Sequence, residues 1–411
     1  MPYIRFILTH PRVLSFGILL TLFSSFGQTF LISIFVPRML AEFPLSTGEF
    51  GLLYAVATLS SAASLPFFGR LMDRMELRRY TLMVGMGLVM ACLTVSLAPN
   101  VPVLFLGILG LRLTGQGLLS LTASTTMARS FSGLRGRALS VSGLGYPLGE
   151  GLLPLLVVLL INLFGWRLSW GILGMVIGVV LLPLTVQLVK GVPGSREGSL
   201  DGDPAGSPED DGERKGVNYR DVLRDGRFHA LLPGSLCLPF LLTSLFLYQV
   251  PLATFKGWTV ETMAAAFIGF ASARMVVSLA VGPLIDRVGA VRLFPFYLIP
   301  VALGMGVLLM AAGSWGAFVF LALAGVSQGC ASAILTAMWT EIYGRESIAS
   351  VKSLVSMLGI FGTALSPVVV GWALQSGMGF SVLLPLFIGM SVLASAISFP
   401  ACMRRIGGRG V

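Results

Sequence analysis

Long apolar segments alternate with short polar ones along most of this chain of 411 residues. A helix needs about 18 or more mainly apolar residues to cross the hydrocarbon core of a bilayer, and about twelve runs of this length can be counted. The predicted spans are residues 13–37, 48–68, 80–98, 102–128, 138–162, 168–189, 229–253, 260–283, 293–312, 315–341, 348–374 and 380–402. The pattern therefore predicts an all-α membrane protein with twelve transmembrane helices.

One polar loop occurs twice. Residues 69–79 follow one apolar run and precede another, and residues 282–292 do the same, with Gly, Leu, Asp and Arg in the same order. Asp73 and Asp286 are 213 positions apart in the chain. A period this long is typical of two membrane halves in parallel orientation. The sequence thus predicts two bundles of six helices each.

The one long polar stretch lies between the two predicted bundles. Residues 191–216 are rich in Gly, Ser, Pro, Asp and Glu, a composition typical of a disordered linker. Residues 218–228 have the pattern of a short amphipathic helix at the membrane surface. We therefore predict an amino-terminal bundle over 1–190, a partly disordered cytoplasmic linker over 191–228 and a carboxy-terminal bundle over 229–411.

Composition and charge agree with this class. The chain is 55% apolar and only 11% charged, whereas a soluble domain is about 25% charged. Its net charge of +10 does not require nucleic acid as a partner, because nearly all Lys and Arg residues fall in segments that lie on one side of the predicted membrane. The exceptions are Arg38, Lys256 and Arg167 on the other side and Arg112 and Arg274 within spans. The positive-inside rule then places both termini in the cytoplasm of a multi-pass protein of the cell membrane.

Several other classes of protein are disfavoured. The four cysteines have no metal-ligand spacing, and no set of nucleophile, base and orienting group indicates an enzyme, so we expect neither a metal nor a cofactor. The predicted external loops are too short for a receptor's binding domain. Because one chain contains both repeats, we expect a functional monomer. Its expected partners are a small-molecule substrate, protons and the lipid bilayer.

The paired loops, in a chain of six plus six spans, resemble those of the major facilitator superfamily. In that family the loop works as a cytoplasmic latch, which is made when the central cavity faces outward and broken when it faces inward. By this resemblance we assign the latch to six residues, which are Gly69, Asp73, Arg74, Gly282, Asp286 and Arg287. The first copy departs from the family pattern at Glu76, where a glycine is usual. A basic loop that only fixes the orientation of the chain remains the alternative.

Two further stretches resemble monocarboxylate and oxalate/formate-type transporters within the superfamily. They are residues 129–140, which lead into the fifth predicted span, and residues 339–345, which follow the tenth. The resemblance implies a small organic anion as the substrate. The acidic and aromatic first-span motif of the animal monocarboxylate carriers is absent from this chain.

Three charged residues stand well inside predicted spans. Arg112 lies about 15 Å from the end of span four at 1.5 Å per residue, Glu150 reaches a similar depth in span five, and Arg274 lies past the middle of span eight. A charged side chain at the centre of a bilayer costs about 2.5–3.5 kcal/mol on insertion scales, so each of these residues needs a function or a partner.

These residues lead to a hypothesis of proton-linked anion transport. An arginine fork matches a carboxylate, and a glutamate that loses its cationic partner to the substrate can take up a proton, so Glu150 is the candidate for proton coupling. The predicted substrate-binding residues are Arg274, Arg112, Gln28, Gln116, Tyr146, Tyr248 and Gln328. Two alternatives remain open, a permanent Arg112–Glu150 ion pair and a proton-driven exporter of amphipathic drugs, for which Pro147 in a glycine-rich span five is a partial match.

Overall fold

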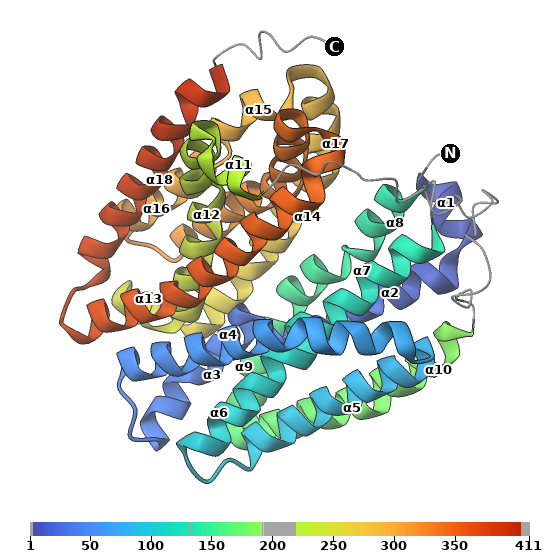
Figure 1. Ribbon diagram of the computed structural model, residues 1–411. Helices are drawn as coiled ribbons and strands as arrows, with labels where there is room; N and C mark the ends of the chain where they lie inside the picture. The colour runs from blue at the N-terminus through green and yellow to red at the C-terminus, as the bar shows by residue number, and fades with distance from the viewer. Residues whose placement is uncertain (1–2, 132–133, 191, 193–218, 404–411) are drawn as a thin grey trace. The chain divides into compact units, whose positions relative to one another are not determined.

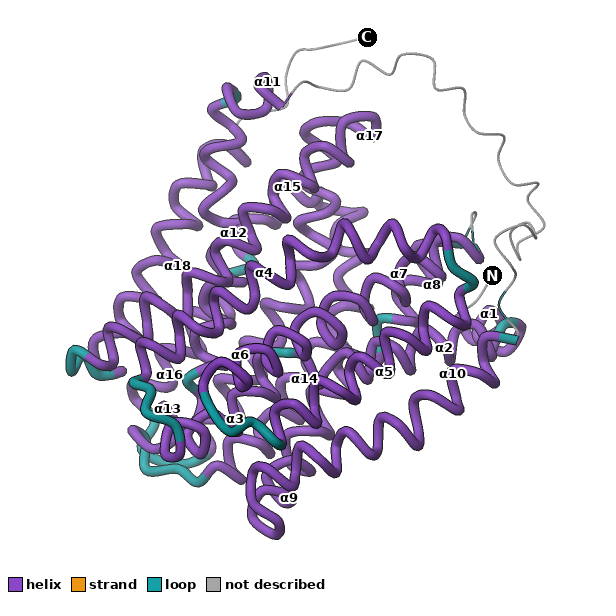
Figure 2. Tube along the Cα trace, turned by 60° about the horizontal axis from the view of Figure 1, so that its bottom comes forward, coloured by secondary structure: helices purple, strands orange, loops and turns teal. Residues whose placement is uncertain are grey.

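The chain is helical throughout the part that the structure describes. The computed structural model describes residues 3–131, 134–190, 192 and 219–403. Every regular element in these ranges is a helix, and Figure 2 shows no strand among them. The predicted all-α class is therefore confirmed, while most of the predicted linker, residues 191 and 193–218, lies outside the described residues.

The contacts divide the chain into two compact units. The amino-terminal unit comprises Met1–Ser46 and Leu52–Asp211, and the carboxy-terminal unit comprises Thr47–Gly51 and Gly212–Val411. Each unit buries its own apolar core.

The amino-terminal unit is a series of helices (Figure 1), some of which are continued by short 3₁₀ or π segments. Its elements are α1 (Tyr3–Thr9), α2 (Pro11–Phe23), η1 (Ser24–Gly27), α3 (Thr29–Glu42), α4 (Thr47–Arg74), α5 (Leu77–Ser96), α6 (Val101–Gly110), η2 (Leu111–Leu119), α7 (Ser120–Ser130), α8 (Arg135–Ser142), α9 (Gly145–Val176), η3 (Ile177–Leu181) and α10 (Leu182–Val189). The segment η1 is a 3₁₀-helix, and η2 and η3 are π-helices. Helices α2, α7 and α8 pack against one another.

The carboxy-terminal unit is built in the same way. Its elements are α11 (Tyr219–Arg224), α12 (Gly226–Leu247), α13 (Gln249–Phe255), α14 (Val260–Val288), α15 (Ala290–Leu293), η4 (Phe294–Phe296), α16 (Ile299–Met310), α17 (Trp315–Gln375) and α18 (Phe380–Met403). Helix α17 is interrupted at Gly344, whose φ of 78° is not helical. Helices α12 and α16 both pack against α17, and both also pack against α18 (Figure 1).

Eleven helical segments of the described chain are long and apolar enough to cross a membrane. One of them, Arg135–Val189, is 55 residues long and contains Gly165, whose φ of 75° and ψ of 167° end one helical stretch and begin the next. Large apolar side chains such as Leu163, Met175 and Val179 are exposed on this segment. In a soluble protein such surfaces would be costly, so their exposure fits a lipid environment.

Candidate functional site

Two irregular helices meet in the amino-terminal unit. The 3₁₀-helix η1 separates α2 from α3, and the π-helix η2 separates α6 from α7. A Cβ atom at Gly27 would overlap the backbone of η2, and a Cβ at Gly115 would lie only 2.7 Å from Gly27 N. The two backbones therefore touch at a point where only glycine fits on either side. π-Helical turns are frequent at functional sites.

Arg112 lies at this crossing. Its side chain is 5% exposed, and its Nη1 donates a hydrogen bond of 3.2 Å to Gly27 O. Its Cζ lies 5.0 Å from the centre of the Tyr54 ring, which places the cation over the π face of that ring. The Tyr54 hydroxyl in turn lies 2.8 Å from Thr29 Oγ1. Residues from three segments of the unit thus hold one buried guanidinium.

Glu150 lies on α9, which packs closely against α2 and η1. A Cβ at Gly145 would overlap the α2 backbone, and a Cβ at Gly149 would overlap Ser25 Oγ. Thr21 Oγ1 also donates to Ser142 O at 2.6 Å. This close approach of the backbones leaves Glu150 only 8% exposed. The predicted kinked, glycine-rich span therefore contributes close packing as well as a buried carboxyl.

Several polar atoms around the crossing are buried without a hydrogen-bond partner in the described part of the chain. They are Ser25 Oγ, Arg112 Nε, Gln116 Oε1 and Ser120 Oγ. Gln28 is half-buried at the end of η1, and Tyr146 is half-buried on α9. Buried polar groups usually find partners, so this group of donors and acceptors can receive a polar ligand. The structure thus brings Arg112, Gln116, Gln28, Tyr146 and Glu150 into neighbouring segments of one unit.

The remaining predicted binding residues lie in the carboxy-terminal unit. Arg274 is half-buried on α14, and Gln328 is half-buried on α17. A Cβ at Gly329 would lie 2.9 Å from Arg274 O, so α14 and α17 cross at this level. Tyr248 is buried, and its hydroxyl donates to Pro367 O at 2.6 Å. Arg274 and Gln328 therefore lie on neighbouring helices, whereas the Tyr248 hydroxyl is used within the bundle.

The latch residues lie at helix ends. On α4, Asp73 accepts a hydrogen bond of 2.5 Å from Arg129 Nη2 of α7, while Gly69 is half-buried and Arg74 is exposed. The second copy ends α14, where Asp286 and Arg287 are exposed and Gly282 is half-buried. There, Glu341 of α17 accepts from Ala290 N at 2.9 Å and Val291 N at 3.1 Å. The two copies thus connect to their neighbouring helices through different chemistry.

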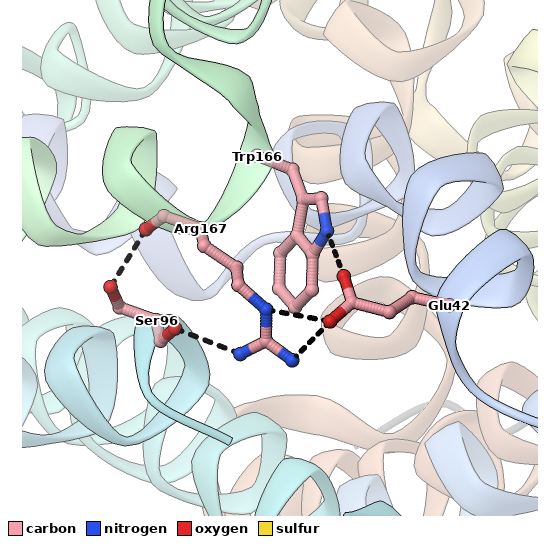
Figure 3. Close-up of polar contacts among 4 residues, drawn as sticks. All are labelled: Glu42, Ser96, Trp166 and Arg167. Carbon is pink, nitrogen blue, oxygen red and sulfur yellow. Dashed lines mark hydrogen bonds and ion pairs between the residues drawn. The ribbon is translucent and has the colours of Figure 1, made fainter. Parts of the chain in front are cut away.

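A polar cluster at the far end of α3 was not predicted from the sequence. Figure 3 shows the Arg167 guanidinium pointing at the Glu42 carboxylate, with Nε and Nη2 donating to Oε1 at 2.8 and 2.6 Å. Trp166 Nε1 donates to Glu42 Oε2 at 2.8 Å, and Arg167 Nη1 donates to Ser96 O at 3.0 Å. The cluster ties the ends of α3 and α5 to the turn of α9 at Gly165. The available signal in the sequence was Gly165-Trp166-Arg167 between two predicted spans. From the sequence, Arg167 was considered only as a basic residue outside the predicted cytoplasmic segments.

Metal binding finds no support in the described ranges. No group of three or more His, Cys, Asp and Glu side chains that could hold a metal ion occurs there. The four cysteines are free thiols.

Comparisons with known proteins identify the wider relationship. The family model described as Major Facilitator Superfamily matches residues 18–278, more than half of the chain. The fold is similar to that of a bacterial homologue of the human lysosomal transporter Spinster, in an inward-facing and unoccupied conformation, with 15% identity, 98% of this chain and 97% of that chain covered, and a TM-score of 0.71. It is also similar to the nucleoside transporter NupG, with 14% identity, 96% and 100% coverage and a TM-score of 0.73. No curated protein matches the chain.

Proposed function

Because the chain belongs to the major facilitator superfamily of membrane transporters, which work by alternating access, we propose that it carries a small organic anion together with protons. The stretches that resemble monocarboxylate and oxalate/formate-type transporters support the anion. The proposal extends the family assignment to a substrate class and a coupling ion.

The observation that carries the proposal is the buried Arg112 guanidinium. Its Nη1 is used by Gly27 O, but its Nε has no hydrogen-bond partner among the described residues. A buried donor left without an acceptor costs about 1–3 kcal/mol, and more for a charged group. A carboxylate is the acceptor that fits the edge of a guanidinium best. We therefore infer that an anionic substrate completes this site.

Glu150 is the proposed proton carrier. It is one of the few buried ionisable groups of the amino-terminal unit, on the helix that packs against η1. An ionised carboxylate in a low-dielectric environment is costly, so it neutralises by taking up a proton when its surroundings change. Proton uptake at Glu150 during substrate binding would couple the two movements.

Three residues of the carboxy-terminal unit are also proposed to contact the substrate. Arg274 supplies a second cation on α14, and Gln328 supplies an amide on the neighbouring α17. Tyr248 is proposed as a further substrate contact, although its hydroxyl already donates to Pro367 O. The Asp73 and Asp286 loops are proposed to act as the latch of alternating access.

We further propose the arrangement of the chain in the membrane. The turn at Gly165 divides the segment Arg135–Val189 into two helical stretches, which would bring the eleven candidate segments to twelve spans. Residues 1–190 and 229–411 would then form the two bundles, with residues 191–228 as the cytoplasmic linker. Both termini would lie in the cytoplasm, and one copy of the chain would form the pathway in the cell membrane.

The proposal is tested with purified protein in liposomes that contain a trapped pH dye. Lactate, formate, oxalate and larger organic anions are added one at a time, with protein-free liposomes as the control for diffusion of the neutral acid. Protein-dependent internal acidification with one anion is the expected result. Absence of acidification with every anion would contradict the proposal, and proton movement driven by amphipathic cationic drugs would instead support the exporter alternative.

A further inference from the structure

We propose that the crossing of η1 and η2 is the hinge of the amino-terminal unit, and that Arg112 keeps the helix broken at Gln28 until an anion binds. This inference deepens the proposed function and rests on it for the ligand. Its structural part, the control of the break by Arg112, stands on the contacts of the crossing alone.

The break between η1 and α3 changes the backbone hydrogen bonds of the helix. Gln28 has an extended backbone, with φ of −83° and ψ of 151°, directly after η1. Leu31 N donates to Gln28 O at 3.2 Å, whereas in a continuous α-helix it would donate to Gly27 O, four residues earlier. The Gly27 carbonyl is thereby released from the helix, and Arg112 Nη1 occupies it at 3.2 Å.

Two residues set the position of the Arg112 guanidinium. The Tyr54 ring lies beneath it, with 5.0 Å between Arg112 Cζ and the ring centre, and the Tyr54 hydroxyl is hydrogen-bonded to Thr29 at the start of α3. Tyr54 is fully buried. Tyr54 and Thr29 are therefore positioning residues, since they fix where Arg112 lies relative to both halves of the broken helix.

An anionic ligand and the Gly27 carbonyl are alternative acceptors for the Arg112 guanidinium. A carboxylate is a stronger acceptor for a guanidinium than a neutral carbonyl, because it carries a full negative charge and can accept two parallel N–H bonds from the planar fork. An anion at the open Nε edge attracts the whole guanidinium toward that edge, and this movement weakens the bond from Nη1 to Gly27 O. A buried carbonyl without a partner is costly, so Leu31 N then donates to Gly27 O and the extended Gln28 becomes α-helical. Anion binding is thereby converted into a shorter and continuous helix from α2 to α3.

The geometry allows this change at a single point. The crossing glycines, Gly27 and Gly115, leave no side chain between the two backbones, so η1 can change its hydrogen bonds without moving a packed side chain of η2. An extended residue such as Gln28 rises about 3.3 Å and an α-helical residue about 1.5 Å, so conversion of Gln28 shortens the segment by about 2 Å. This shortening is the quantity to measure.

The test uses two spin labels on opposite sides of the hinge. Ser15 on α2 and Arg38 on α3 are both exposed, so Ser15→Cys and Arg38→Cys are introduced in a full-length chain whose four native cysteines are replaced by alanine. Electron–electron double resonance then gives the distance distribution in nanodiscs. Arg112→Lys, which keeps the charge but removes the planar fork, is compared with the unaltered site and with the matched control Arg274→Lys.

The expected result is a mean distance about 2 Å shorter in Arg112→Lys, and the same shortening at an intact site when an anion that drives acidification is added. Arg274→Lys should leave the distance in the absence of anion unchanged. An unchanged distance in Arg112→Lys overturns the hinge. An unchanged distance at the intact site with a transported anion overturns the coupling to the ligand.

Failure of the proposed function is recognised separately. If no anion acidifies the liposomes, the substrate class is wrong, and the Arg112→Lys comparison still decides the hinge. If Arg112→Lys does not fold, Tyr54→Leu removes the ring beneath the guanidinium and takes its place. Shortening in that variant supports the hinge, and an unchanged distance overturns it.

Discussion

Each unit contains an internal contact at equivalent positions of the repeat, but the two contacts use different chemistry. Glu42 at the end of α3 is paired with Arg167 after the turn at Gly165. The positions 213 residues later are Phe255 and Phe380, whose ring centres lie 5.8 Å apart in the carboxy-terminal unit. Both turns contain a glycine with positive φ, at 75° for Gly165 and 86° for Gly377. The repeat therefore preserves where two segments touch, and it leaves open whether charge or apolar area holds them.

The same exchange occurs in the core of each unit. Tyr54, which lies beneath the Arg112 guanidinium, corresponds to Phe267 at the offset of 213, and Phe267 packs with Phe246 and Phe270. Arg112 itself corresponds to the fully buried Ala324 at the offset of 212. One unit thus carries a buried cation where the other carries an aromatic and aliphatic core. We propose that the charge in the amino-terminal unit serves function, because the carboxy-terminal unit has the apolar Phe267 and Ala324 at the equivalent positions.

The largest expected effect comes from removing that charge. Arg112→Met should reduce anion-driven acidification by about 100-fold, because a hydrogen bond to a charged group contributes about 1.5–3 kcal/mol. Transport in liposomes and thermal unfolding are measured on the same preparation, with Ala324→Ser at the corresponding position as the control. Arg112→Met that retains half of the flux would show that the buried cation is only a packing element.

A smaller effect is expected where the loop repeats differ. Glu341 caps the start of α15 through two backbone amides, whereas Arg129 at the corresponding position forms an ion pair with Asp73. Loss of a capping acceptor costs about 0.5–2 kcal/mol, and an exposed ion pair contributes about 0–1 kcal/mol. Glu341→Ala should therefore destabilise the protein more than Arg129→Ala in denaturant unfolding. The reverse order would contradict this difference between the loops.

The smallest expected effect is a difference in salt dependence between the Glu42–Arg167 contact and the Phe255–Phe380 contact. The Glu42 and Arg167 side chains are 44% and 33% exposed, so a double-mutant cycle should give about 0.5–1 kcal/mol of coupling that falls as salt is added. The cycle on Phe255 and Phe380 should give about 0.5–1.5 kcal/mol that is independent of salt. Equal salt dependence of the two couplings would show that charge is not what holds the Glu42 end.

Much of the fold was predictable because its main features depend on the order of apolar and polar residues along the chain. The length of the apolar runs predicted the long apolar helices, while the two related six-helix halves expected from the repeated Asp73 and Asp286 loops stay a prediction. The interruptions were harder. The span predicted over 229–253 is interrupted between α12 and α13 at Tyr248, where hydropathy does not change. The turn at Gly165 depends on a single positive φ, which a window average does not detect.

The candidate site was only partly predictable. A charged residue deep within a long apolar run stands out, so Arg112 and Glu150 were identified from their positions in the sequence. Tyr54 and Thr29 were missed because their role depends on which helices cross, and a tyrosine or threonine in a span has no special composition. The comparison of repeats offered a signal, since a hydroxyl occurs at Tyr54 where the second half has Phe267.

The most direct test of the account is the pH dependence of anion transport in Glu150→Gln, set against Thr363→Val at the corresponding position of the second unit. The account predicts that Glu150→Gln abolishes anion uptake driven by a proton gradient while anion exchange at equal pH continues, and that Thr363→Val keeps the pH profile of the unaltered protein. An unchanged pH profile in Glu150→Gln would contradict the proposal that the amino-terminal unit carries the proton.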